Sequence, residues 1–471
     1  MKNYISNPSS KLLFVFNYSK FLIIAIISIT FTSCSENINF DNINDGTSGT
    51  NTTQTRSTQN VNEIINEGEA IIIAQNFFRY EAEYKTHEYI NKDVQKVTSL
   101  SDPTSTIPLL HIIEFTKGFC IVSADTRYEP ILAYSEENQW GGADLDGPNV
   151  MLNLYKSRIK DIKKTNEKQP EFLKGIWKRL LTYEQIKATE DKKLEPRNSC
   201  TYGECRPDYC ESYYNNTVGP FVHPVARWSQ AESFTLFSPN DNNCSSFYCV
   251  KSPAGCGPIA LGMLMRYHES PIMNMSFNGV NSYTDYSSMP ITRGTCSQNT
   301  GSFLSSAMLV RLCGSAMNSI YGVSGSCNTA TIPANISNGL NFFGYTHNGL
   351  GSLSSRYSAI NNDLVSEFPV ILTGATNSIG ADWHIWLADG YKQFHYESWT
   401  DNGTCNGDPY YGSHPYYCGV CPSCINCSIF AATQWHMNWG WNGTSNGWYA
   451  ASPYSIGDYD SLMHAYTNIR P

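Results

Sequence analysis

Cys256 stands in a sequence context that favours a reactive thiol. Gly255 and Gly257 flank it, and Pro258 follows, a residue that suits a first helical turn because its missing N–H is not needed there. We therefore predict that Cys256 lies at the N-terminus of a helix, where unpaired N–H groups and the helix dipole favour a thiolate. From this segment alone, a buried or disulfide-bonded structural cysteine is an equally open interpretation.

The segment after Cys256 has the pattern of a buried helix. Apolar residues recur there at spacings of one, three and four, and the pattern ends at Glu269-Ser270-Pro271. The buried face comprises Ile259, Ala260, Met263, Leu264 and Tyr267. A second helix is predicted at 301–314 and strands at 369–373, 384–389 and 434–439, which makes this domain α+β with its helical part first.

A thiolate that attacks an acyl group needs a base to share its proton, a group that orients the base, and donors for the oxyanion. His268, one of ten histidines, lies more than three turns along the helix of Cys256 and therefore cannot be the base. His384 follows Cys256 by 128 residues, close to the separation typical of papain-like enzymes. If the segment around His436 is a strand, His436 and Asn438 share one face, so His436 remains a rival to His384.

A series of motifs spans residues 218–449. They are Val218-Gly-Pro220, Trp228-Ser-Gln230, Ala254-Gly-Cys-Gly-Pro-Ile-Ala260, Tyr321-Gly-Val-Ser-Gly-Ser326, Trp383-His-Ile-Trp-Leu-Ala-Asp-Gly-Tyr391, His436-Met-Asn-Trp-Gly-Trp-Asn-Gly443 and Asn446-Gly-Trp-Tyr449. In this order they resemble the streptopain (C10) family of cysteine peptidases. The resemblance implies an α+β fold, in which a papain-like cysteine peptidase domain is preceded by a small α+β prodomain.

The same resemblance implies roles for five residues. Cys256 is the nucleophile, His384 its imidazole partner and Gln230 the oxyanion donor. Asn438 and Trp439 orient and shield the histidine. An amide can polarise a tetrahedral oxyanion and an asparagine carbonyl can hold an imidazole in one tautomer, so the residue types suit these roles. For Trp439, core packing is an equally open interpretation. We expect no metal and no cofactor.

Three features depart from the family pattern. Asp382-Trp383 stands where the family usually has two glycines before the histidine, so the shape of the cleft is not carried over. Gly257-Pro258 differs from the small or β-branched residues common after the nucleophile. A cysteine-rich insertion at 396–433 need not occur in the family, and it either remodels the cleft rim or decorates the surface.

The N-terminus resembles a bacterial export signal. Three lysines precede the apolar stretch 21–30, which is shorter than the about 20 apolar residues that a spanning helix needs. Phe31-Thr-Ser-Cys34 resembles a lipobox, although leucine is usual at the position of Phe31, and predicts lipidation of Cys34. We assign 1–34 to a signal peptide and the polar stretch 35–60 to a flexible tether. Plain export without a lipid is the alternative.

The 16 cysteines of an exported chain indicate disulfides. The C-x-x-C spacing from Cys418 to Cys427 superficially suggests an iron–sulfur or zinc site, but export favours a disulfide-stapled surface loop. The net charge of −9 argues against nucleic acid as the main partner.

Residues 61–165 are predicted to form a small first domain. It contains an amphipathic helix at 61–78 and strands at 109–115 and 118–125, joined by a hairpin turn. Parts of it, at 69–78 and 118–134, resemble the family's inhibitory propeptide. The charged region 166–215 is predicted to be a linker, and cleavage between about 190 and 216 would release the catalytic domain, 216–471.

Together these features predict an exported cysteine endopeptidase made as a zymogen. It would hydrolyse peptide bonds of proteins through a Cys-His dyad and a thioester acyl-enzyme, with protein substrates and its own prodomain as partners. It would reach the outer membrane or cell surface through the lipid anchor alone, or be secreted after processing. The alternative is a catalytically weak surface protein that binds a partner through the cysteine-rich insertion. A third candidate is an acyltransferase or amidase with the same dyad.

Overall fold

The computed structural model describes residues 63–85, 92–141, 146–165, 167–170, 173–182, 213–375, 383–400, 426–452 and 463–471. All of them belong to one compact unit, 59–471. The predictions for the signal peptide with Cys34, the tether, most of the linker and most of the cysteine-rich insertion lie outside these residues. Within them, no helix is long and apolar enough to cross a membrane.

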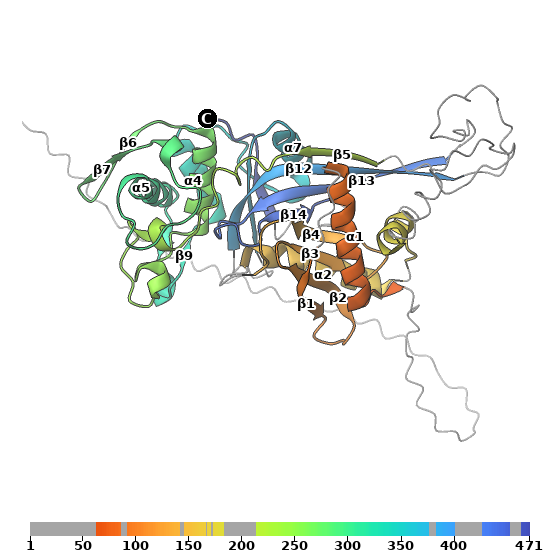
Figure 1. The fold of residues 1–471 in the computed structure, drawn as a ribbon. Coiled ribbons are helices and arrows are strands. Elements are labelled where there is room, and N and C mark those ends of the chain that lie inside the picture. Colours follow the sequence, from red (N-terminus) through yellow and green to blue (C-terminus); the bar gives the residue numbers. More distant parts are fainter. Residues whose placement is uncertain are drawn as a thin grey trace, which may run out of the picture. The chain divides into compact units, whose positions relative to one another are not determined.

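The helices α1 (Glu67–Lys85) and α2 (Asp146–Lys164) pack on a four-stranded antiparallel sheet in the first domain (Figure 1). The strands of this sheet are β1 (Val94–Ser101), β2 (Pro108–Phe115), β3 (Phe119–Ser123) and β4 (Ile131–Ser135). A further helical segment, 173–182, lies in the predicted linker and packs in the same core as α1. In β2, Ile113 packs with α1 and Ile112 with α2. Both faces of the strand are therefore buried, which explains its nearly continuous apolar run. The predicted strands are confirmed.

The predicted start of the first helix at residue 61 is wrong. The helix begins at Glu67 because Asn66 caps it: Glu69 N–H donates to Asn66 Oδ1, and Asn66 N–H donates to Glu69 Oε2. This reciprocal pair is a capping box, which satisfies two N–H groups at the helix end. The helix also extends beyond residue 78, to Lys85.

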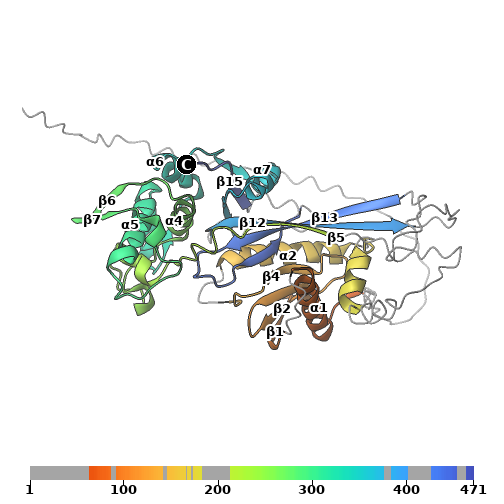
Figure 2. The same ribbon diagram turned by 45° about the horizontal axis from the view of Figure 1, so that its top comes forward.

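One sheet of eleven strands, counted over the described residues, runs through both domains (Figures 1 and 2). Its order is β1-β2-β3-β4-β14-β13-β12-β11-β15-β10, and β5 also pairs with β12. The two domains join where β4 pairs with β14, with Trp448 opposite Tyr134. The added strands are β5 (Tyr213–Val218), β10 (Leu350–Ser352), β11 (Val370–Ala375), β12 (Trp383–Thr400), β13 (Asn426–Asn438), β14 (Gly447–Ala450) and β15 (Met463–Tyr466).

The helical part of the second domain, residues 213–471, comes first and packs on this sheet. Its elements are α4 (Cys256–His268), α5 (Gly301–Ala316), α6 (Ile336–Phe342), α7 (Leu353–Val365) and the short strands β6 (Asn274–Phe277), β7 (Val280–Tyr283), β8 (Ile320–Tyr321) and β9 (Thr329–Ala330). Along β12, Ile385 faces the core with α4 and α5, whereas Trp386 faces the core with α2 and α7. The α+β class, both predicted helices and the three predicted strands are confirmed.

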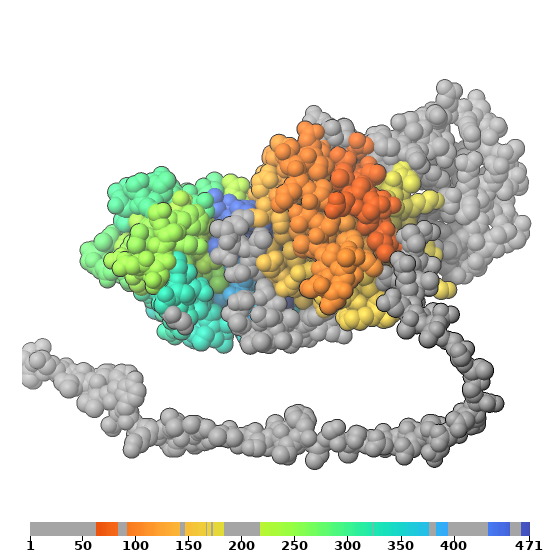
Figure 3. Space-filling view, turned by 90° about the horizontal axis from the view of Figure 1, so that it is seen from below, coloured from red at the N-terminus to blue at the C-terminus, as the bar shows by residue number. Residues whose placement is uncertain are grey.

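The first domain therefore contributes to the core of the second domain. Helix α2 packs against β11 and β12 on the face opposite α4. In the space-filling view of Figure 3, the surface of the first domain (orange and yellow) adjoins that of the second domain (green and blue).

Two disulfides lie within the described residues, Cys244–Cys327 and Cys249–Cys296. They confirm the expectation that this chain forms disulfides. The run Cys418 to Cys427 lies outside the described residues, so its disulfide assignment stays a prediction.

Candidate active site

Cys256 is the first residue of α4, as predicted. Gly255 precedes it with φ +94°, in the left-handed region that favours glycine. A Cβ on Gly255 would lie 2.9 Å from Thr329 Cγ2, and one on Gly257 would lie 3.0 Å from side-chain atoms of Thr331. Both glycines are thus required by the close approach of the segment around β9. Cys256 is buried and is not disulfide-bonded.

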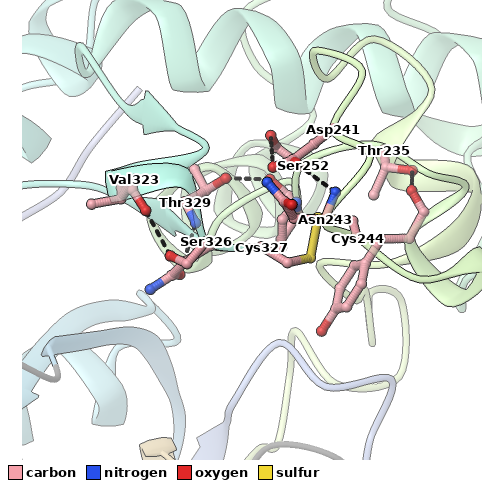
Figure 4. Close-up of a disulfide and its surroundings, with 12 residues drawn as sticks. Thr235, Asp241, Asn243, Cys244, Ser252, Val323, Ser326, Cys327 and Thr329 are labelled. Atoms are coloured by element: carbon pink, nitrogen blue, oxygen red, sulfur yellow. Dashed lines mark hydrogen bonds between the residues drawn. A yellow bond between two sulfur atoms is a disulfide. The ribbon is translucent and has the colours of Figure 1, made fainter.

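The loop before Cys256 is braced from one side by β9. Thr329 Oγ1 donates a 2.6 Å hydrogen bond to the carbonyl of Pro253. The disulfide Cys244–Cys327 ties the segment before β9 to the segment that leads into this loop (Figure 4). The backbone that presents Cys256 is therefore held by covalent and hydrogen-bonded contacts.

Gln230 lies beside the same loop. Its backbone carbonyl accepts a 2.8 Å hydrogen bond from Ala254 N–H, and its side chain is buried. The preceding residue, Ser229, forms a β-bridge with Trp441. The segment of Gln230 therefore connects the loop of Cys256 with the turn that follows β13.

His384 lies near the start of β12, 2% exposed. Its Nε2 atom is 2.9 Å from the carbonyl oxygen of Trp439. A carbonyl only accepts, so Nε2 carries a hydrogen and donates it. The imidazole also stacks on Trp441, with ring centroids 5.5 Å apart and planes 14° apart.

The turn that holds the histidine also contacts the cysteine helix. Gly440 has φ +76°, and a Cβ there would lie 3.0 Å from Ile259 Cγ2 on α4. Because Trp441 both stacks on His384 and bridges to Ser229, the segments of Gln230, Cys256, His384 and Trp439 converge. The arrangement can form a thiol–imidazole pair with an amide and a helix N-terminus beside it.

The Asn438 side chain does not face His384. Its amide donates to the carbonyl of Ala226 at 2.8 Å, and its Oδ1 accepts from Asn446 Nδ2 at 2.9 Å. The carbonyl that binds the imidazole belongs to the main chain of Trp439 instead. Side-chain motifs in the sequence carry no direct signal for such a backbone acceptor.

Gly147, in the first turn of α2, lies directly against the imidazole. A Cβ at this position would lie 2.5 Å from His384 Cδ2 and 2.5 Å from Trp439 Cε3. The first domain thus places bare backbone on the histidine, where any side chain would collide. Gly147 was not predicted from the sequence. The Gly147-Pro148 pair, like Gly257-Pro258, could have indicated a helix start but not this contact.

Two family models match the chain. The Spi protease inhibitor model matches residues 62–159, and the Peptidase C10 family model matches residues 228–411. Together they span more than half of the chain, in the order inhibitor, peptidase. The chain belongs to the C10 family of cysteine peptidases.

The C10 match includes Gln230, Cys256 and His384 but ends before Asn438 and Trp439. A mutant fragment of Prevotella intermedia prointerpain A is 15% identical; the match covers 80% of this chain and 98% of that chain, with a TM-score of 0.44. The active wild-type interpain A cysteine protease of the same organism is 16% identical, with coverages of 53% and 94% and a TM-score of 0.35. No curated protein matches the chain.

The structure places His436 of this C10 peptidase in a separate cluster. Its Nδ1 is 2.6 Å from Asp389 Oδ1, while Asp389 Oδ2 accepts the backbone N–H groups of Val222 and His223. The His223 ring lies 5.2 Å from that of His436. Burial, with a smaller contribution from His436, lowers the pKa of His223 to about 3. His384 binds the Trp439 carbonyl, whereas His436, the alternative candidate for the base, binds Asp389.

Two of the departures from the family pattern, Asp382 and Trp383, directly precede His384 in the sequence. Asp382 lies outside the described residues. Trp383 is half-buried, and its ring lies 5.9 Å from that of His464. Among the described residues, no group of three or more His, Cys, Asp and Glu side chains could hold a metal ion.

Proposed function

We propose that this C10 peptidase is an exported endopeptidase that cleaves proteins through Cys256 and His384. The observation that carries the proposal is the position of Cys256 at the N-terminus of α4, with His384 held by the Trp439 carbonyl on the adjoining segment. The helix terminus favours the thiolate, and the fixed imidazole presents Nδ1 for the proton.

In the proposed reaction, the Cys256 thiolate attacks the peptide carbonyl and forms a tetrahedral oxyanion. The Gln230 side-chain amide and the N–H groups at the start of α4 stabilise that charge. When the carbon–nitrogen bond breaks, His384 gives its Nδ1 proton to the leaving amine and a thioester remains on Cys256. Water then attacks the thioester while His384 takes up a proton, and the acid product and free thiol are released. Trp441 shields the imidazole by stacking on it.

The prodomain keeps the peptidase latent. Gly147 closes on His384, so no substrate group fits between prodomain and imidazole. We place the activating cut before β5, because β5 is paired with β12 and a protease cannot easily bind backbone that is hydrogen-bonded in a sheet. The range proposed for cleavage thereby narrows to about 190–212.

Export and lipid attachment complete the proposal. Disulfides persist in oxidising compartments, and two of them brace the catalytic domain. Cys34 is proposed to carry the lipid. Mass spectrometry of the protein from cells, with and without reductant, would report lipidation, the processing site and the disulfides; an unmodified Cys34 in a chain that retains 1–34 contradicts this part.

The catalytic assignment is tested by substitution in the mature enzyme. Cys256→Ala and His384→Ala should each lower kcat/KM for peptide hydrolysis by about 10⁴-fold or more. Cys313→Ala is the matched control: Cys313 is also buried and not disulfide-bonded, but lies in α5. Persistent activity in Cys256→Ala overturns the assignment.

Alkylation separates the peptidase from a binding protein with the same scaffold. In the mature enzyme, iodoacetamide should modify Cys256 in preference to Cys313, because burial raises the pKa of the Cys313 thiol well above its usual range. A folded, prodomain-free sample whose active-site titration is near zero would favour the binding protein.

A further inference from the structure

The main chain of Trp439 lies just beyond the end of the sheet. The β12–β13 pairing ends at Asn438 and the β13–β14 pairing at Met437. Trp439 is fully buried, so its N–H and carbonyl need partners outside the ladder. The carbonyl is bound by His384, and the N–H donates to Asn446 Oδ1 at 2.9 Å. The Asn446 side chain thus provides the acceptor that a neighbouring strand would provide within the sheet.

The Asn446 amide has one orientation that satisfies its neighbours. Its Nδ2 donates to Asn438 Oδ1 at 2.9 Å and to His223 Nδ1 at 3.0 Å, and its Oδ1 faces Trp439 N–H. A flipped amide would set oxygen against two acceptors and N–H against N–H. The bond to His223 requires a lone pair on Nδ1, which agrees with a pKa lowered to about 3 by burial.

His223 is itself fixed within the catalytic domain. Its backbone N–H donates to Asp389 Oδ2 at 2.6 Å, and the other oxygen of Asp389 binds His436. The titratable groups that face His223 are His436, Asp389 and Arg227. A continuous chain of buried contacts therefore runs from the segment after the linker to the carbonyl that holds His384.

The prodomain also forms hydrogen bonds with the loop that carries Ser445 and Asn446. Asn138 Nδ2 donates to the carbonyl of Asn446 at 3.0 Å, and Ser445 N–H donates to the carbonyl of Gln139 at 2.8 Å. Gly141 N–H donates to Ser445 Oγ at 3.2 Å. These contacts leave with the prodomain, whereas the side-chain bonds of Asn446 all remain inside the peptidase domain.

We propose that Asn446 is a positioning residue of the mature peptidase: its amide, held by His223, fixes the Trp439 main chain and thereby the His384 imidazole. This proposal rests on the proposed role of His384 in proton transfer.

The first test is Asn446→Ala in the mature enzyme, made by processing the full chain with an added protease that cuts in the lysine-rich linker. The kcat for peptide hydrolysis should fall about 10- to 100-fold with KM within about twofold of wild type, because the base is misplaced while the substrate cleft is kept. The matched control is Asn361→Ala, which removes the acceptor of Trp435 Nε1. Trp435 lies in β13, the strand that leads to Trp439. Equal kcat for Asn446→Ala and Asn361→Ala overturns the proposal.

The second test also serves if Asn446→Ala fails to fold. Asn446→Asp keeps an acceptor for Trp439 N–H but cannot donate to His223, so the contact returns only when His223 Nδ1 carries a hydrogen, and the imidazolium makes it in its strongest form. The new carboxylate favours this charged imidazole, so kcat should recover toward wild type as pH falls from 8 to about 5.5. Adding His223→Leu to Asn446→Asp should abolish the recovery. A loss of kcat that is equal at every pH indicates a merely structural role and overturns the proposal.

Failure of the proposed function gives a different result. If the mature wild type shows no activity that Cys256→Ala removes, the catalytic assignment has failed. If the wild type is active and Asn446→Ala matches it in kcat and pH profile, the positioning role alone has failed.

Discussion

Two of the places where the prodomain meets the peptidase domain differ in kind. At the active site the prodomain contributes bare backbone, because Gly147 lies against His384 and Trp439 with no room for a Cβ. Away from the site it contributes a strand and a buried ion pair. Strand β4 pairs with the edge of β14, and Lys392 of β12 binds Glu81 Oε2 of α1 and, at 2.6 Å, the hydroxyl of Tyr134.

The two contacts differ in what each can supply: the contact at Gly147 can block the active site, and the distant contact can supply the free energy of prodomain binding. The contact at Gly147 places prodomain backbone against His384 and Trp439 and thereby excludes substrate. The distant contact contains a buried ion pair and large aromatic side chains, since Trp448 packs in the core of the prodomain with Phe77 and Phe78, and Lys392 and Glu81 are almost fully buried. Main-chain strand pairing is tolerant of sequence, so the ion pair adds specificity for this prodomain. We infer that the distant contact holds the prodomain and the site contact makes it inhibitory.

The largest effect is expected from Glu81→Leu. It leaves Lys392 buried without its carboxylate, and breaking one partner of a buried pair costs about 3–5 kcal/mol. Docking should weaken by at least about 100-fold, so iodoacetamide should alkylate Cys256 faster in the unprocessed chain, as followed by mass spectrometry.

The control for this experiment is Glu114→Gln, whose partner Lys96 is mostly exposed. Surface pairs of this type contribute about 0–1 kcal/mol, so Glu114→Gln should leave alkylation nearly unchanged. Combining Glu81→Leu with Lys392→Met should restore part of the latency, because an apolar pair removes the stranded charge. Alkylation of Glu81→Leu at the wild-type rate would show that the ion pair does not hold the prodomain.

A smaller effect, confined to the zymogen, is expected from Gly147→Val. The new side chain overlaps the imidazole, and overpacking of this kind costs about 1–3 kcal/mol, so the first turn of α2 should move off the site. Alkylation of Cys256 in the unprocessed chain should rise about tenfold, while kcat/KM of the processed enzyme stays at wild type. Gly68→Ala in α1 is the control, since its Cβ would meet only Asn66 Oδ1 at 3.3 Å. A zymogen as latent as wild type contradicts the site contact as the inhibitory one.

The two contacts also show what the sequence could and could not predict. The start of α4 at Cys256 was predictable because Gly255, with its positive φ, and Pro258, with its fixed φ, act through their own backbone dihedrals. Gly147 was not, because its requirement for glycine arises from His384, which is 237 residues away in the chain. The β4–β14 pairing depends on a strand edge, which has no local pattern.

The site residues divide in the same way. Gln230, Cys256 and His384 stand in side-chain motifs, and the structure brings their segments together. The acceptor for His384 is a main-chain carbonyl at Trp439, which sequence motifs do not display, and Asn438 faces Asn446 instead. Asn446 could have been singled out only from its buried hydrogen bonds.

The last prediction concerns how the free energy of unfolding depends on pH. It distinguishes weaker contacts between prodomain and peptidase domain from a less stable peptidase domain. Burial lowers the pKa of His223 to about 3, whereas an unfolded histidine titrates near 6.5. Between these values the unfolded chain binds one more proton, so the free energy of unfolding should fall by about 1.4 kcal/mol for each pH unit of acidification. His223→Asn should remove this slope in urea unfolding between pH 6 and 4, and His347→Asn, at a half-exposed site, should remove less. Because His223 lies in the peptidase domain, its slope belongs to zymogen and mature enzyme alike. Any extra slope in the zymogen therefore measures protons taken up within the prodomain or its contacts, and equal slopes would mean that acid weakens the fold without selectively releasing the prodomain.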